Sequence, residues 1–243
     1  MGSESLNQAA TFSFQYPRTR EGVTVTGLKI TGRPTVLLGT NGAGKTTLMR
    51  LLAKQLRPKS GHVPELGKAV YVPQRFEGIR GFRVIDYVAY VAWLNGAGWS
   101  DSKKDARHWI SFVGLNSQRD KECRQLSGGQ QARLQIATAL NSRAEFVLLD
   151  EPSAALDPLA KRDLQDLYES IANSGVGLWV SSHQPLEIEA PFLDVVVLNR
   201  GAVDFQGTVE EFLNLANDSS GSRRSSDCSD YTHALAVAFR RGR

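Results

Sequence analysis

The sequence feature that most constrains the fold is the run GTNGAGKT at residues 39–46. It follows a short apolar stretch, which is typical of a strand buried on both faces of a parallel sheet, and it leads into residues 46–56, which have helical spacing. Gly39, Gly42 and Gly44 let backbone N–H groups approach an anion without Cβ clashes. Lys45 adds a positive charge, and the following helix adds its dipole. This order of strand, glycine-rich loop and helix predicts a phosphate-binding loop.

A hydroxyl and a carboxylate elsewhere in the sequence suit a hard divalent cation. The hydroxyl oxygen of Thr46, next to Lys45, is a ligand of the kind that Mg²⁺ prefers. Asp150 ends the apolar run FVLLD, which places its carboxylate at the carboxyl edge of the sheet, where α/β proteins bind ligands. Glu151 follows directly, and this second acid is well placed to orient and polarise an attacking water molecule. The two motifs together predict Mg²⁺-dependent phosphate chemistry.

Strand and helix patterns alternate along the chain. Apolar or alternating runs predict strands at residues 11–16, 23–30, 35–39, 68–72, 145–150, 176–181, 194–199 and 202–206. Helical spacing predicts helices at residues 46–56, 84–124 with a break at 95–100, 128–140, 158–172, 209–216 and 231–240. Asp101 or Ser102 is the predicted cap of the helix after the break. This order predicts an α/β fold with a mainly parallel sheet and a small antiparallel sheet at the N-terminus.

The composition excludes several classes of protein. With 41% hydrophobic and 22% charged residues, the 243-residue chain lies in the globular range. Its longest apolar-leaning stretch, residues 84–94, is shorter than the roughly 20 residues of a transmembrane helix. Residues 1–10 lack the pattern of a signal peptide, and two cysteines are too few for a disulfide framework. The net charge of +4 is not concentrated on one segment of the body, so no nucleic-acid partner is expected.

A third motif, LSGGQ at residues 126–130, lies shortly before the run that ends at Asp150. Together with the loop at 39–46, it resembles the signature of ATP-binding cassette (ABC) ATPases, and the resemblance covers residues 11–216 in order. The resemblance implies a P-loop NTPase core of the RecA-like type, an N-terminal antiparallel β subdomain, and an inserted helical subdomain at about residues 76–140. It also implies ATP and Mg²⁺ as cofactors, with ATP hydrolysed to ADP and phosphate.

The resemblance assigns roles to further residues. Tyr16 looks like the aromatic residue that stacks on adenine, although Phe12 and Phe14 compete for that role. Gln74, in VPQ, resembles the glutamine that touches Mg²⁺ and faces a membrane subunit. His183, in SSH, resembles the histidine that holds the γ-phosphate, and its place just after an apolar strand agrees with that role.

The LSGGQ segment suggests a site shared between two chains. Ser127, Gly128 and Gly129 open a predicted helix, so their N–H groups and the Ser127 hydroxyl form a second anion site, far along the chain from the first. This is best explained if two copies meet head-to-tail and each ATP lies between the loop of one and the Ser127 segment of the other, as the resemblance implies. Asp157, in ALD, resembles the loop that crosses to the partner, and it also caps the helix that follows.

The expected site divides into three sets of residues. The ATP-binding set is Tyr16, Gly39, Asn41, Gly42, Ala43, Gly44, Lys45, Thr46, Thr47, Ser127, Gly128, Gly129, Gln130 and Asp157. The catalytic set is Glu151, His183 and Gln74, and the metal ligands are Thr46, Gln74 and Asp150.

These patterns predict the ATP-hydrolysing subunit of a transporter. Its expected partners are a second copy and a separate integral membrane permease, which would hold it at the inner face of the cell membrane on the cytoplasmic side. The permease is expected near residues 76–95, because Phe76, Ile79, Phe82 and Val84 would be unusual on a solvent surface. Residues 181–207 are most similar to bacterial drug, antibiotic and lipid exporters, which favours export.

Other functions are considered beside that of an exporter subunit. An importer ATPase, or a non-transport ABC ATPase such as an iron–sulfur cluster assembly factor, stays open as an alternative. A catalytically idle binding module is disfavoured by the intact Glu151 and His183.

The expected boundaries are a nucleotide-binding domain at 1–216, a Ser-rich linker at 217–230, and a short helix or tail at 231–243.

Overall fold

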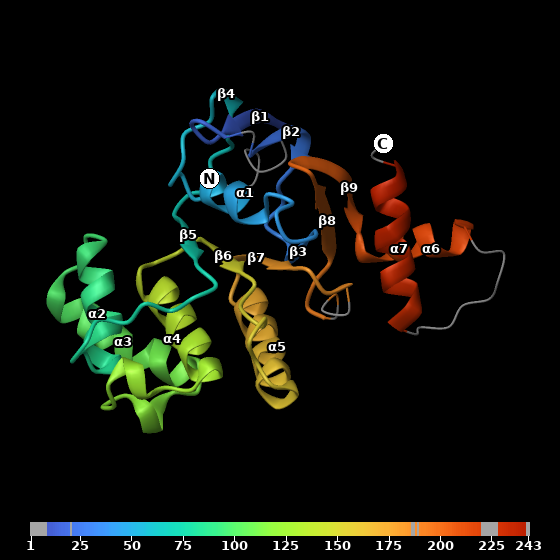
Figure 1. The fold of residues 1–243 in the computed structure, drawn as a ribbon. Helices are drawn as coiled ribbons and strands as arrows, with labels where there is room; N and C mark the ends of the chain where they lie inside the picture. Colours follow the sequence, from blue (N-terminus) through green and yellow to red (C-terminus); the bar gives the residue numbers. More distant parts are fainter. Residues whose placement is uncertain (1–8, 20, 186–187, 189, 220–227, 242–243) are drawn as a thin grey trace.

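Two β-sheets with helices packed around them make up the described part of the chain (Figure 1). A computed structural model describes residues 9–19, 21–185, 188, 190–219 and 228–241. The strands are β1 (Ala9–Gln15), β2 (Gly22–Lys29), β3 (Thr35–Leu38), β4 (Ser60–His62), β5 (Ala69–Val72), β6 (Phe146–Asp150), β7 (Gly177–Ser182), β8 (Asp194–Asn199) and β9 (Ala202–Thr208). The helices are α1 (Lys45–Leu52), α2 (Val84–Leu94), α3 (Trp99–Phe112), α4 (Gly128–Asn141), α5 (Pro158–Asn173), α6 (Val209–Ser219) and α7 (Cys228–Arg241), with 3₁₀ turns η2 (Asn116–Gln118) and η3 (Cys123–Gln125).

The larger sheet has the strand order β5-β6-β7-β3-β8-β9. Its first five strands are parallel, and β9 is antiparallel to β8. The smaller sheet, β2-β1-β4, is antiparallel. This arrangement confirms the predicted α/β fold, with a mainly parallel sheet, an antiparallel β subdomain and a helical subdomain.

Strands β3 and β6 lie in the middle of the core. Every residue of both strands is buried, because each face of the sheet is covered. Val36 and Leu38 pack into the core on one face, with α5, and Leu37 packs into the core on the other face, with α1 and the antiparallel sheet. The continuous apolar runs in the sequence therefore correspond to strands covered on both sides.

The helical subdomain consists of α2, α3 and α4, which pack on one another on the side of the molecule away from α7 (Figure 1). The predicted cap of α3 is wrong: Gly98 caps this helix in an extended conformation, and Asp101 lies in the first turn, where its charge complements the helix dipole. Helix α1 also ends earlier than predicted, at Leu52, because Lys54 adopts a positive φ of 55°.

The four apolar residues that place the expected permease contact near residues 76–95 differ in their exposure. Val84 is fully buried, because it begins α2 and faces the core. Phe76 and Phe82 are half-buried and pack edge-on or tilted against Tyr87 and Tyr90, with ring centroids 5.5 and 5.2 Å apart. Ile79 alone of the four is largely exposed, at 43%.

Helix α7 packs against the body of the protein. Ala234, Val237 and Ala238 are buried, and the helix contacts β8, β9 and α6. It begins three residues before the predicted range, and α6 extends three residues beyond its own. Within the predicted linker at 217–230, residues 220–227 lie outside the described residues. None of the described helices is both long enough and apolar enough to cross a membrane.

Truncation after Ser219, which removes α7, should therefore lower the free energy of unfolding by about 3 kcal/mol, given the apolar side chains it uncovers. The expected ATP hydrolysis should stay within a few-fold of the full chain, because no described residue of α7 lines the cavity at the glycine-rich loop, residues 39–46. Urea unfolding and phosphate release measure the two quantities. An unchanged unfolding midpoint would show that α7 does not stabilise the body.

Candidate functional site

The glycine-rich loop joins β3 to α1 and contacts strand β8 and the turn between β8 and β9. Gly39 has to be a glycine, because a Cβ atom there would lie 2.4 Å from the carbonyl oxygen of Leu198. Gly44 has φ +104°, and its Cβ would lie 2.7 Å from a methyl group of Val23. Gly201, in the turn between β8 and β9, donates its N–H to the carbonyl of Ala43 at 2.9 Å. The loop is therefore shaped by tertiary packing as well as by its own glycines.

Lys45 lies at the centre of the site. Its side chain is 5% exposed, and its Nζ donates to the carbonyl of Gly39 at 2.7 Å. The same ammonium forms an ion pair with Glu151 at 3.0 Å. One cation therefore serves both the loop and the acid at the end of β6.

The carboxylate of Asp150 is 5% exposed and is held by hydroxyl groups from three different elements. Thr46 Oγ1 donates to Oδ2 at 2.6 Å, Tyr71 OH donates to the same oxygen at 2.8 Å, and Ser181 Oγ donates to Oδ1 at 2.6 Å. Burial and the nearby Asp150 charge raise the pKa of Tyr71 above its usual value, so its hydroxyl stays a donor. Within the described residues no cationic side chain pairs with Asp150.

Glu151 has a positive φ of 46°, which is a strained conformation for this residue type. Its N–H donates to Ser181 Oγ at 2.9 Å, which holds the turn after β6. Its carboxylate contacts Nδ1 of His183 at 3.2 Å in addition to Lys45. The strand end thus presents Glu151 between an ammonium group and an imidazole.

These elements surround a cavity of about 560 Å³, a size typical of small-molecule sites. It brings together predicted residues from four segments: Tyr16, the loop residues 41–47, Gln74, and the adjacent acids Asp150 and Glu151. Glu21, Gly22 and Arg200 also line it, and sequence reasoning did not single them out.

Of the three aromatic residues considered for adenine stacking, only Tyr16 lines the cavity. Phe12 is buried in the core, and Phe14 packs against that core while meeting Tyr16 edge-on at 4.8 Å. Thr47 Oγ1 lies 3.5 Å from the Tyr16 hydroxyl. The ring of Tyr16 is therefore positioned beside the loop by contacts on both sides.

The LSGGQ segment, residues 126–130, does not line this cavity. Ser127 caps α4 through a capping box: it accepts from the N–H of Gln130 at 3.4 Å, and the Gln130 side chain accepts from the N–H of Ser127 at 3.1 Å. Gly128 and Gly129 form the first turn and pack against the start of α5, which Asp157 caps. These five predicted residues lie close to one another but do not line the cavity of the same chain.

Tyr71 and Ser181 are two further residues of the site that sequence reasoning did not single out. Tyr71 and Ser181 lie within the predicted strands at 68–72 and 176–181, and the sequence predicts no role for either. Their bonds to Asp150 span 79 and 31 residues of sequence. The only available signal was their place near the carboxyl ends of parallel strands, where ligand sites form.

Comparison with known proteins identifies the family. The family model for ABC transporters matches residues 29–154, about half of the chain. The energy-coupling factor transporter ATP-binding protein EcfA1 of Thermotoga maritima is 34% identical over 197 residues, covering 75% of this chain and 74% of that protein. A multidrug ABC transporter ATP-binding protein of Escherichia coli, YbhF, is 32% identical over 189 residues, or 72% of this chain and 32% of that protein.

A solved structure agrees with these relatives. An inward-facing metal-chelate type ABC transporter is 26% identical, with a TM-score of 0.74 over 85% of this chain and 86% of that one. The relatives span energy-coupling factor and multidrug branches, so the family is established but the export branch is not. The chain belongs to the ABC transporter family, as an ATP-binding subunit and an ATPase whose hydrolysis of ATP is coupled to transport.

Proposed function

We propose that two copies of this chain bind two ATP molecules head-to-tail and drive a separate membrane permease that exports its cargo. The observation that carries the shared site is the separation of two anion-binding helix starts. The α1 start lines the cavity, whereas the α4 start, capped by Ser127, does not. A second copy that brings its own Ser127, Gly128, Gly129, Gln130 and Asp157 to this cavity would complete the site.

The residues of the cavity have the chemistry to hold the triphosphate. The N–H groups of Gly42, Gly44 and residues 45–47 and the ammonium of Lys45 would bind phosphate oxygens, and Tyr16 would stack on adenine. Gly39 and Ala43 shape the loop instead, because their N–H groups donate to the carbonyls of Ser182 at 3.3 Å and Thr40 at 3.0 Å. Lys45 is already paired with Glu151 at 3.0 Å. A triphosphate that takes over Lys45 would free the Glu151 carboxylate to accept a proton from water, with His183 beside it to hold the γ-phosphate.

The donor set also fits Mg²⁺. Thr46, Asp150 and Gln74 offer hydroxyl, carboxylate and amide oxygens, which are the hard ligands that this ion prefers. The buried Asp150 charge meets only neutral hydroxyl donors among the described residues, so a cation is the partner it lacks. When bound, Mg²⁺ would neutralise charge on the phosphates and orient them.

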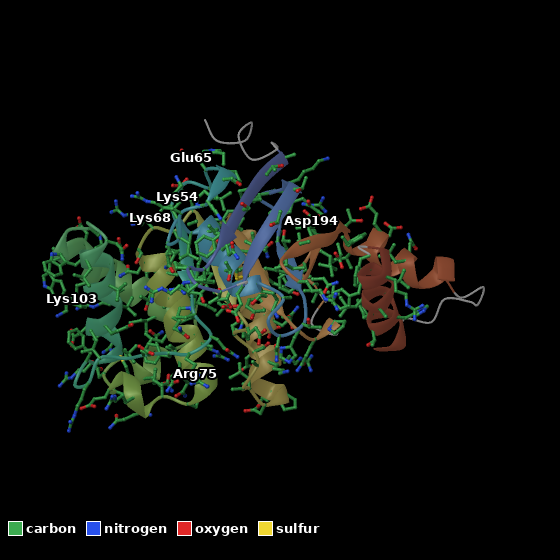
Figure 2. The ribbon with its side chains drawn as sticks, turned by 45° about the horizontal axis from the view of Figure 1, so that its top comes forward. Lys54, Glu65, Lys68, Arg75, Lys103 and Asp194 are labelled. Carbon is green, nitrogen blue, oxygen red and sulfur yellow. The ribbon has the colours of Figure 1, made fainter. Side chains whose placement is uncertain are left out.

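Replacing Lys45 by alanine should weaken ATP affinity by about 10- to 100-fold. A charge-assisted contact is worth roughly 1.5–3 kcal/mol, and the change also leaves Glu151 unpaired beside the phosphates. Isothermal calorimetry in Mg²⁺ buffer measures the affinity. Lys54→Ala is the matched control, because among the described residues the Lys54 ammonium pairs only with Glu65, at the surface (Figure 2). Equal affinities for the two variants would exclude Lys45 from phosphate binding.

A groove beside Gln74 is the proposed permease contact. It has a volume of about 450 Å³ and lies between β5, α2 and α4. Its apolar lining includes Phe76, Tyr87 and Val91. Arg75 (Figure 2) and Glu77 also line it, from the segment that joins the sheet to the helical subdomain. An apolar groove with a few polar groups suits a short helix of a membrane subunit. Such a contact would hold the chain at the cytoplasmic face of the cell membrane.

Export is the proposed direction, supported by the likeness to a multidrug protein. Import is the second candidate, because the energy-coupling factor protein and the metal-chelate type transporter are also similar. Inside-out membrane vesicles of the source cells, which present the ATP site to the medium, separate the two. With a fluorescent phospholipid analogue and ethidium as probes, ATP should drive accumulation in vesicles with the parent chain and not with Glu151→Gln. ATP-driven release of preloaded probe would instead support import.

A further inference from the structure

The hydroxyl of Tyr71 connects strand β5 to the carboxylate of Asp150 in the proposed nucleotide site. It donates to Asp150 Oδ2 at 2.8 Å, and Thr46 Oγ1 donates to the same oxygen at 2.6 Å. Thr46 comes from α1 and Tyr71 from β5, so the carboxylate is held between two elements. Ser181 on β7 fixes the other oxygen at 2.6 Å.

The ring of Tyr71 does not reach the nucleotide cavity. It lines the groove beside Gln74 instead and packs against the core that contains α1. The guanidinium carbon of Arg50, also on α1, lies 6.0 Å from the ring centroid. Tyr71 is not among the residues that line the nucleotide cavity, and its link to that cavity is the hydrogen bond to Asp150.

We propose that Tyr71 is a positioning residue for the metal site, which holds the Asp150 carboxylate in the orientation that binds Mg²⁺ through its hydroxyl. This inference rests on the proposed role of Asp150 as a metal ligand. A donor that hydrogen-bonds a ligating carboxylate fixes the direction of that carboxylate, and removing such a donor typically costs about 10- to 100-fold in metal affinity. Because the same ring lines the groove, the metal site and the proposed permease contact share one side chain.

Replacing Tyr71 by phenylalanine removes only the hydroxyl and keeps the ring in its packing site. Asp150 then loses one of its three hydroxyl donors and can rotate away from the metal position. The affinity for Mg²⁺ in the presence of ATP should fall by roughly 10-fold, the lower end of the effect of removing a group that hydrogen-bonds a metal ligand. The affinity for ATP in EDTA should stay within twofold, because no phosphate contact is lost.

Two measurements test this without relying on turnover. Calorimetry gives the ATP affinity with Mg²⁺ and with EDTA, and electron paramagnetic resonance of Mn²⁺ gives the fraction of bound metal directly. Tyr90→Phe is the matched control, since Tyr90 lies on α2 and contacts Phe82 and Trp93, away from the site. The control should match the parent chain in both measurements. An equal loss of ATP affinity with and without metal in Tyr71→Phe would overturn the proposal, because it would indicate a general structural defect.

A double-mutant cycle with Asp150→Asn separates the role of Asp150 as a metal ligand from the role of Tyr71 as a positioning residue. If Asp150→Asn leaves metal binding unchanged, the proposed metal site itself fails. If Asp150→Asn weakens metal binding and Tyr71→Phe does not, only the role of Tyr71 is overturned. If both weaken it but their effects multiply in the double variant, Tyr71 acts by another route and the proposal is wrong. We expect the double variant to bind metal no more weakly than Asp150→Asn alone.

Discussion

Replacing Glu151 by glutamine should lower ATP turnover at least 100-fold while ATP still binds. The amide keeps the size of the side chain but cannot accept a proton from water, and losing a general base costs typically 10²–10⁴ in rate. The phosphate contacts of the loop and the hydroxyl bonds of Asp150 do not involve the Glu151 side chain. Phosphate release measures turnover, and calorimetry measures binding.

The same variant should accumulate as an ATP-bound dimer. Since ATP would stay uncleaved between the two chains, size exclusion with ATP should show a species of twice the monomer mass. Glu65→Gln is a matched control, because Glu65 is an exposed acid that pairs with Lys54 (Figure 2) and does not line the cavity. A Glu151→Gln chain that hydrolyses ATP at the parent rate would remove Glu151 from the role of base.

Mixing two inactive chains should restore activity, which is the second large effect we expect. Ser127→Arg places bulk and charge at the start of α4, and Lys45→Ala removes the cation of the loop. In a head-to-tail heterodimer, one site takes its loop from the Ser127→Arg chain and its α4 start from the Lys45→Ala chain. That site is intact, so we expect up to half of the parent activity per heterodimer when one intact site suffices.

The controls decide between shared and separate sites. Ser117→Arg adds the same side chain to an exposed position on η2 and should leave the ATPase activity unchanged on its own. If each site were built within one chain, both sites of the heterodimer would stay defective. A heterodimer confirmed by differential tags, without recovered ATPase activity, contradicts the shared site once a heterodimer of parent and Lys45→Ala chains is shown to be active.

Local patterns in the sequence were enough to predict the phosphate-binding loop and the carboxylate edge. The run at residues 39–46 and the run ending at Asp150 each place a buried strand directly before a polar site, so neighbouring residues along the chain carry the signal. Most strand and helix positions followed for the same reason. The exceptions were β4, whose three exposed residues carry no alternation, and the end of α1, where Lys54 takes a positive φ. The predicted helix after the break at 95–100 is also wrong beyond residue 112, because α3 ends at Phe112 and only the short 3₁₀ turns η2 and η3 follow before Leu126.

The strand order was decided by the tertiary structure. β3 lies between β7 and β8, which places the loop that follows it next to residues from the second half of the chain. Tyr71 and Ser181 meet Asp150 only through this order, and Gly201 reaches Ala43 in the same way. The spacing of hydrophobic residues in the sequence indicates which face of a helix or strand is buried, but it does not indicate which neighbouring element covers that face.

By itself, therefore, the sequence determined the elements, the phosphate-binding loop and the acids at the strand ends, because each depends on contacts between residues close along the chain. Only the tertiary structure decided that Tyr16 rather than Phe14 lines the cavity, that Val84 is buried, and that α7 packs on the body. It also decided which hydroxyls hold Asp150. These outcomes depend on contacts between distant segments, whose geometry is set by the packing of the whole sheet and its helices.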